Sequence, residues 1–151
     1  MNIAPKSLWK ERDRNELLHR VERLSPEAKP LWGRMNASQM LAHLAKWMLM
    51  AEGGLDTAEL KLPMRYPPLK QFIIYWMPWP KGVPTAPQLR CNDHFDWDTE
   101  YSAVRQLISS FEKRNPKGPW PAHPAFGKMS SRAWGVLGYR HTDHHFRQFG
   151  I

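Results

Sequence analysis

The end of the chain carries a cluster of histidines whose spacing suits metal binding. The stretch "YRHTDHHFRQFG", residues 139–150, contains His141, His144 and His145. Residues four apart on an α-helix differ by only about 40° in direction, so His141 and His145 can aim their imidazoles at one point. His144 lies about 100° from His145 around the helix axis, so we expect it to support such a site from outside or to lie at the surface.

A metal site built on this pair needs a third ligand, because protein metals usually take three or more side-chain ligands. His43 is the best candidate, since it stands alone among apolar neighbours in "SQMLAHLAKWMLM", residues 38–50. Inward-facing residues of different helices converge in a bundle, which would bring His43 to the other two. Two simpler interpretations stay open: His43 as a hydrogen-bonded core residue, and the terminal pair as a wet helix surface.

Three neutral imidazoles would favour a catalytic site over a closed structural one. They leave the charge of the ion uncompensated and at least one coordination position open, where a water or thiol would lose its proton near neutral pH. Imidazole ligands suit several divalent ions; we expect zinc or nickel first, with iron or copper as alternatives. The single cysteine, Cys91, is a weaker candidate nucleophile, because no neighbour in the sequence would lower its pKa.

Other polar residues could surround the site. His123, in "HPAFGK", is stiffened by the proline that follows, and it could line the site or cap a buried backbone segment. Four basic residues lie near the proposed mouth in sequence, and they could attract an acidic thiol or be merely solvated: Lys128, Arg132, Arg140 and Arg147.

Four amphipathic segments would position these residues. Helical spacing of apolar residues predicts helices at residues 13–24, 36–53, 98–114 and 130–149. Each begins at a polar residue able to cap the first turn, namely Asp13, Asn36, Asp98 and Ser130. Residues 55–97, rich in proline and tryptophan, hold at most a short helix near "PLKQFIIYW" and are expected to form a long crossover that walls or covers a site. The pattern predicts an all-α four-helix bundle.

Composition limits the class of protein. A chain of 151 residues fits one domain, residues 1–151, and its single cysteine with no signal-like apolar run favours the cytoplasm. No segment has the length of a membrane-spanning helix, so we expect no membrane association. The net charge of +8 is dispersed among acidic residues, which argues against specific nucleic-acid binding.

Several motifs together resemble the DinB-like (damage-inducible protein B, or YfiT-like) superfamily. The closest likeness is to a branch largely of unknown function, through "WGRMNASQMLAHL", "GVPTAP", "HPAFGKMS" and "YRHTDHHFRQFG". The resemblance implies an up-down-down-up bundle whose long crossover joins the second and third helices. It also implies a divalent metal on His43, His141 and His145, with Gln148 in support. The proline-rich crossover departs from the thiol transferases of the superfamily.

Two functions follow as hypotheses. The resemblance implies a metal-dependent enzyme acting on a small-molecule substrate, for example a transferase that uses a low-molecular-weight thiol such as bacillithiol, an isomerase that uses mycothiol, or a related hydrolase. The alternative is a non-catalytic metal- or small-ligand-binding domain of a stress response, which could form a homodimer through a bundle face.

Overall fold

The computed structural model describes residues 4–151 and contains four long helices and one short one. They are α1 (Glu11–Val21), α2 (Ala37–Ala51), α3 (Leu69–Tyr75), α4 (Trp97–Ser110) and α5 (Ser131–Gln148). Single 3-10 turns, at Pro63–Arg65, Pro87–Leu89 and Phe111–Lys113, complete the regular structure of the described residues. The predicted all-α bundle is confirmed.

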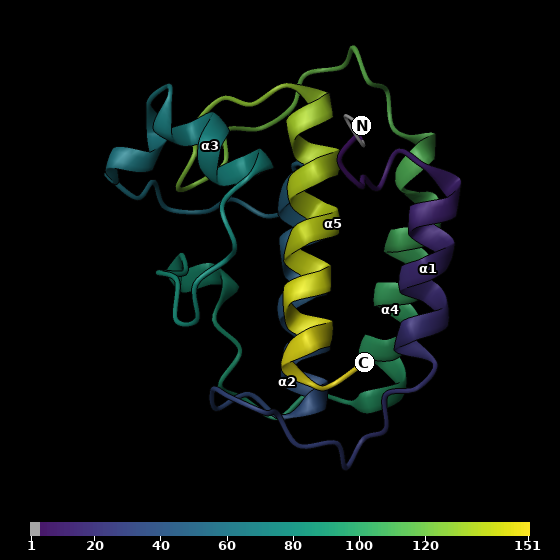
Figure 1. The fold of residues 1–151 in the computed structure, drawn as a ribbon. Helices are drawn as coiled ribbons and strands as arrows, with labels where there is room; N and C mark the ends of the chain where they lie inside the picture. The colour runs from purple at the N-terminus through teal and green to yellow at the C-terminus, as the bar shows by residue number, and fades with distance from the viewer. Residues whose placement is uncertain (1–3) are drawn as a thin grey trace.

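The four long helices form the bundle in an up-down-down-up order. In Figure 1, α1 and α5 run in one direction while α2 and α4 run in the other, so α2 and α4 are parallel neighbours. A parallel pair of consecutive long helices requires a crossover along the length of the bundle. Residues 52–96 make that crossover, and it carries α3 beside α5. No helix in the described part of the chain is long and apolar enough to cross a membrane.

Two of the four predicted caps are correct. The Asn36 side chain accepts a hydrogen bond from the backbone N–H of Gln39, and the Gln39 side chain accepts one from the backbone N–H of Asn36, which completes a capping box. The Ser130 hydroxyl likewise accepts from the backbone N–H of Ala133 at the start of α5.

The other two caps were placed two or three residues too late. Asp96, not Asp98, caps α4, because its carboxylate accepts from the backbone N–H of Thr99 at 2.9 Å. The first helix begins after Lys10, and Asp13 lies buried in its first turn. There the Asp13 carboxylate accepts from the backbone N–H of Ser7, so it fixes the preceding segment instead of the helix end.

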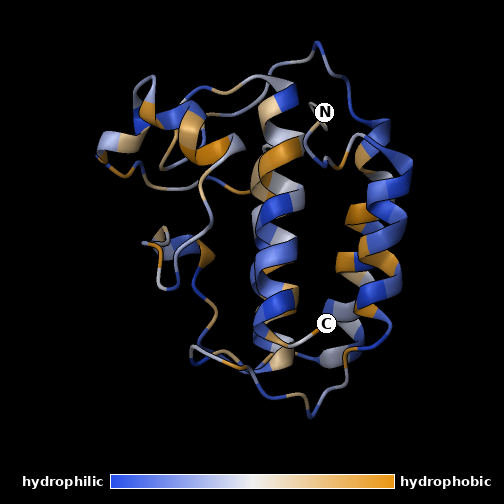
Figure 2. Cartoon of the chain, viewed as in Figure 1, coloured by the Kyte–Doolittle hydropathy of each residue, from blue (hydrophilic) through white to orange (hydrophobic). Residues whose placement is uncertain are grey.

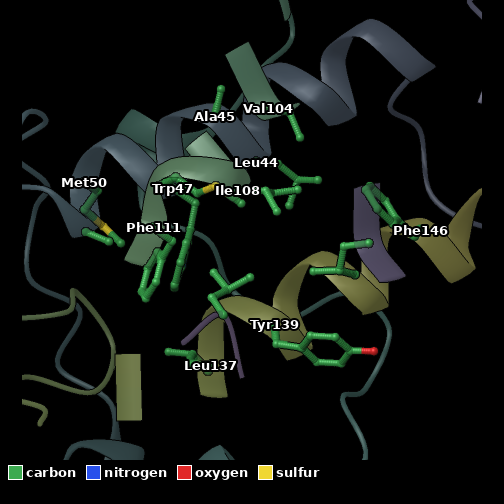
Figure 3. Packing of buried hydrophobic residues seen from close by; sticks show 14 of the residues in the cluster. Leu44, Ala45, Trp47, Met50, Val104, Ile108, Phe111, Leu137, Tyr139 and Phe146 are labelled. Atoms are coloured by element: carbon green, nitrogen blue, oxygen red, sulfur yellow. The ribbon is translucent and has the colours of Figure 1, made fainter. Parts of the chain in front are cut away.

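The core fills the space between the helices with apolar side chains (Figure 3). Its largest fully buried members come from every long helix and from the segments between them, and include Leu17, Leu44, Ile108, Phe111, Trp134 and Phe146. The second half of α5 is different, because Figure 2 colours much of it as hydrophilic. His141, His145 and Gln148 in this half are nevertheless buried, so the bundle encloses a polar cluster.

The segment before α1 packs closely on α5 at Gly135. The backbone N–H of Leu8 donates to the Gly135 carbonyl at 3.0 Å, and a Cβ atom on Gly135 would lie 2.3 Å from Cδ1 of Trp9. The absence of a side chain at this position therefore allows the N-terminal segment to lie against the helix.

We predict that Gly135→Ala destabilises the protein. Alanine is normally favoured over glycine inside a helix by roughly 0.5–1 kcal/mol, but the overlap with Trp9 should reverse this and lower the free energy of unfolding by about 1–3 kcal/mol. Denaturant unfolding measures the change. The control is Ser102→Ala, at an exposed site on α4, whose free energy of unfolding should stay within about 0.5 kcal/mol of wild type. A Gly135→Ala protein as stable as wild type would contradict the packing argument.

Candidate metal centre

Three buried histidines from two helices meet inside the bundle. His43 on α2 and His141 and His145 on α5 each offer a ring nitrogen, and these three atoms all lie within 4.8 Å of one another. The Nε2 atoms of His43 and His141 are 3.0 Å apart. Each side chain is less than a tenth exposed. The convergence expected from helical spacing is present, while metal binding by these residues stays a prediction.

Hydrogen bonds on the outer side of two rings fix their tautomers. Nδ1 of His43 lies 2.8 Å from the carbonyl oxygen of Leu89, which can only accept, so Nδ1 carries the proton. Nδ1 of His145 lies 2.8 Å from Oε1 of Gln148 and donates to it in the same way. A neutral imidazole protonated at Nδ1 has its lone pair on Nε2, so both rings present a lone pair on the other side.

Burial keeps all three rings neutral. It lowers the pKa of His43 below the ordinary 6.5, against the opposing hydrogen bond to Leu89. It lowers the pKa of His141 well below that value, and the neighbouring imidazoles of His145 and His43 add to the effect. The pKa of His145 falls to about 3, again chiefly through burial. At neutral pH each ring is therefore uncharged and keeps one nitrogen lone pair, which is the form in which histidine binds a metal.

The donor set fits a divalent ion. Nitrogen atoms bound at 2.0–2.1 Å to a tetrahedral ion lie about 3.3 Å apart, a value between the observed 3.0 Å of His43 and His141 and the 4.8 Å limit of the triad. Nδ1 of His141 is buried and has no hydrogen-bond partner among the described residues. The described residues thus supply an acceptor for the outer nitrogen of His43 and of His145, but none for that of His141.

Gln148 is held by the loop that precedes α2. Its Nε2 donates to the carbonyl of Trp32 at 2.8 Å, which leaves Oε1 as the acceptor for His145. Gly33 is the next residue, with φ of 83°, and a Cβ atom there would lie 2.5 Å from Nε2 of Gln148. Only glycine therefore lets this loop approach the side chain that orients His145.

The two other predicted supporting histidines have different surroundings. The His144 ring is half-buried beside the triad, with its centroid 5.1 Å from that of His145 and 5.8 Å from that of Trp32. His123 is buried, and its Nδ1 accepts from the backbone N–H groups of Ala125 and Phe126. His123 thus combines both expected roles, because it caps a loop and also lines the cavity next to the triad.

A cavity of about 580 Å³ opens onto the triad. The crossover contributes much of its wall, as the sequence predicted for this long segment. Its apolar lining includes Met35, Trp47, Met64, Ile73, Met77, Trp79, Val83 and Phe126. Its volume lies within the roughly 300–1,000 Å³ typical of small-molecule sites.

Arg140 attaches this wall to the ligand helix. Its guanidinium donates to the carbonyl oxygens of Ile73, Ile74 and Met77 at the C-terminal end of α3. A cation is favourable there, because the last carbonyls of a helix lack partners and carry partial negative charge. Arg140 is therefore engaged with main-chain oxygen atoms in the structure, and attraction of an acidic thiol, one of the two roles considered for it, stays a hypothesis. Arg147 is also engaged, in an ion pair with Asp143.

Cys91 lines the cavity but is not an activated nucleophile. It is buried, and burial raises the pKa of its thiol above the ordinary value, against the opposing effect of Lys46. The thiol stays protonated at neutral pH.

Three residues that support the triad were not predicted from the sequence: Trp32, Gly33 and Leu89. Each acts through its backbone, and the only available signal was the short motif "WGRMN" before α2, which contains the first two.

We predict that His123 makes the protein less stable in acid. Burial lowers its pKa from 6.5 to about 3. Between these pH values the unfolded chain binds a proton that the folded chain excludes. The free energy of unfolding therefore falls as the pH drops below 6.5. The expected slope is up to about 1.4 kcal/mol per pH unit. Unfolding of chelator-treated protein at pH 7.5 and pH 5 measures it.

Two variants separate titration from capping. Asparagine can accept the same loop N–H groups, so His123→Asn should lose less stability than wild type between these pH values while staying near wild type at pH 7.5. His123→Ala should show the same flatter dependence but lower stability at both. An unchanged pH dependence in both variants would contradict the assignment.

Comparison with known proteins gives one match. No curated protein matches the chain, and no solved structure does. Residues 5–150 match the model of a family described as protein of unknown function (DUF1569). That range contains the three converging histidines, Gln148 and the whole crossover. Because the match spans nearly the full length, the chain belongs to the family of proteins of unknown function DUF1569.

Proposed function

We propose that this protein is a divalent-metal-dependent enzyme with His43, His141 and His145 as its ligands. The observation that carries the proposal is the meeting of three neutral, buried imidazoles at the wall of an open cavity. A structural site would be closed by four protein ligands, whereas three imidazoles facing a cavity leave room for a substrate atom. We further infer a DinB-like relationship, supported by the helix order, the crossover and the placement of the histidines.

A divalent ion at this site would act as a Lewis acid and lower the pKa of a water or thiol bound to it. The protein's own residues supply orientation. The Leu89 carbonyl and Gln148 hold two rings in the required tautomer, and apolar side chains form much of the wall beside them. A thiol-dependent transferase or a related hydrolase fits this chemistry best, with zinc or nickel as the preferred ion.

A second candidate is a binding domain without catalysis. One observation favours it: among the described residues that line the cavity, none is a carboxylate, and the cysteine thiol is protonated. General acid–base work in the cavity would therefore depend on the histidines or on Lys81. Stoichiometric metal in a protein that is inert toward a panel of thiols and electrophiles would favour this candidate.

We predict one tightly bound zinc or nickel ion per chain. Single substitutions His43→Ala, His141→Ala and His145→Ala should each weaken binding by at least about 100-fold, because two imidazoles rarely hold a metal. Elemental analysis after equilibrium dialysis measures the stoichiometry, and circular dichroism checks folding. His94→Ala, at an exposed loop position, should bind like wild type; a wild-type protein that stays metal-free would refute the proposal.

We also predict that Gly33→Ala weakens metal binding without removing a ligand. The new Cβ atom would displace Gln148 and release the His145 ring, and loss of such a supporting contact typically costs 10–100-fold in affinity. Gly53→Ala is the matched control, because Gly53 has a similar φ of 78° but open space around it. A competition titration measures the zinc affinity of both variants. Equal affinities would contradict the role assigned to Gln148.

A further inference from the structure

The lining of the cavity is positively charged in addition to being apolar. Three cationic residues, Arg34, Lys81 and Arg90, line it, and all three are exposed. Among the described lining residues there is no aspartate or glutamate. None of the three cations forms an ion pair with another described residue. A recess with charges of one sign and low-dielectric walls attracts ligands of the opposite charge.

The walls between these cations and the triad suit a flat apolar body. Trp32, Trp47 and Trp79 line the cavity together with methionine side chains, which adapt to ligands of varied shape. The ring centroids of Trp47 and Trp79 lie 5.2 Å and 5.4 Å from that of His141. An apolar group between these rings would therefore reach the histidines.

The cations belong to the same segments that position the triad. The ammonium group of Lys81 lies 4.6 Å above the ring of Trp32, which joins the crossover to the loop before α2. The Trp32 carbonyl accepts the hydrogen bond from Gln148, which orients His145. Arg34 follows two residues later on that loop. Arg90 follows Leu89, whose carbonyl accepts from His43, so all three cations lie on segments that support the triad.

We propose that this cavity binds an organic anion with an aryl or comparably bulky apolar body. Arg34, Lys81 and Arg90 receive its carboxylate, the tryptophan and methionine walls receive its body, and a donor atom elsewhere in the molecule meets the histidine triad. The last part rests on the proposed metal function, whereas selection of the anion by the three cations does not. Guanidinium groups favour carboxylates because they match them with two parallel N–H donors.

The test compares three probes that differ only in their terminal group, which is anionic, neutral or cationic: 4-phenylbutanoate, 4-phenylbutanamide and 4-phenylbutylamine. Isothermal titration calorimetry with zinc-loaded and with metal-free protein gives each affinity. We expect the carboxylate to bind at least about ten-fold more tightly than the amide in both forms, and the amine most weakly. The preference should shrink as salt rises. A carboxylate preference that appears only with zinc would overturn the inference, since the metal and not the cations would then bind the anion.

Variants locate the preference. In metal-free protein, where zinc binding does not enter the measurement, the triple variant Arg34→Gln, Lys81→Gln, Arg90→Gln should lower the ratio of carboxylate to amide affinity to about two-fold or less. Lys117→Gln, at an exposed position outside the cavity, should keep the full ratio. A triple variant that retains the wild-type ratio would overturn the inference.

The His141→Ala variant keeps the two proposals distinguishable. It should lose zinc and still prefer the carboxylate, because the three cations are intact. Wild-type protein that binds zinc but treats carboxylate and amide alike would overturn the anion inference and leave the metal proposal standing. Wild-type protein that prefers the carboxylate but never binds zinc would overturn the metal proposal and support the anion inference.

Discussion

The arrangement of this bundle depends on keeping three imidazoles neutral in one buried space. A protonated ring would carry its positive charge away from water and beside the other two rings. Burial therefore lowers the pKa of each of the three histidines. A neutral ring must still place its own N–H. Leu89 and Gln148 provide the acceptors for two of the rings, and their positions in turn determine where the crossover and the last turn of α5 lie.

These acceptors explain why distant segments meet at the site. Leu89 belongs to the 3-10 turn Pro87–Leu89, so the crossover must return to α2 before it reaches α4. Gln148 must be held by the Trp32 carbonyl, so the loop between α1 and α2 must lie against the end of α5. Both segments also contribute to the lining of the cavity, which opens beside the histidines.

Helical periodicity was enough to predict the triad, because His141 and His145 share a helix face and His43 lies on an apolar stripe. The same reasoning predicted the bundle and the caps Asn36 and Ser130. It could not find Leu89, Trp32 or Gly33, whose contribution is a carbonyl oxygen or the lack of a side chain. The caps of α1 and α4 were misplaced because several acidic residues lie near each start. Asp96 caps α4, whereas α1 follows Lys10 without a side-chain cap, because Asp13 accepts from the backbone of Ser7 instead.

Arg140 holds α3 through main-chain oxygen atoms alone. An anchor of this kind is indifferent to the side chains of the segment it holds. The exposed residues of the segment 69–77 could therefore change in size and polarity during evolution while the segment keeps its place beside α5, whereas Ile73 and Ile74 are also held by core packing. The histidine next in sequence to Arg140 would stay where it is through all such changes. One arginine would in this way keep His141 in place while the cavity wall beside it varies.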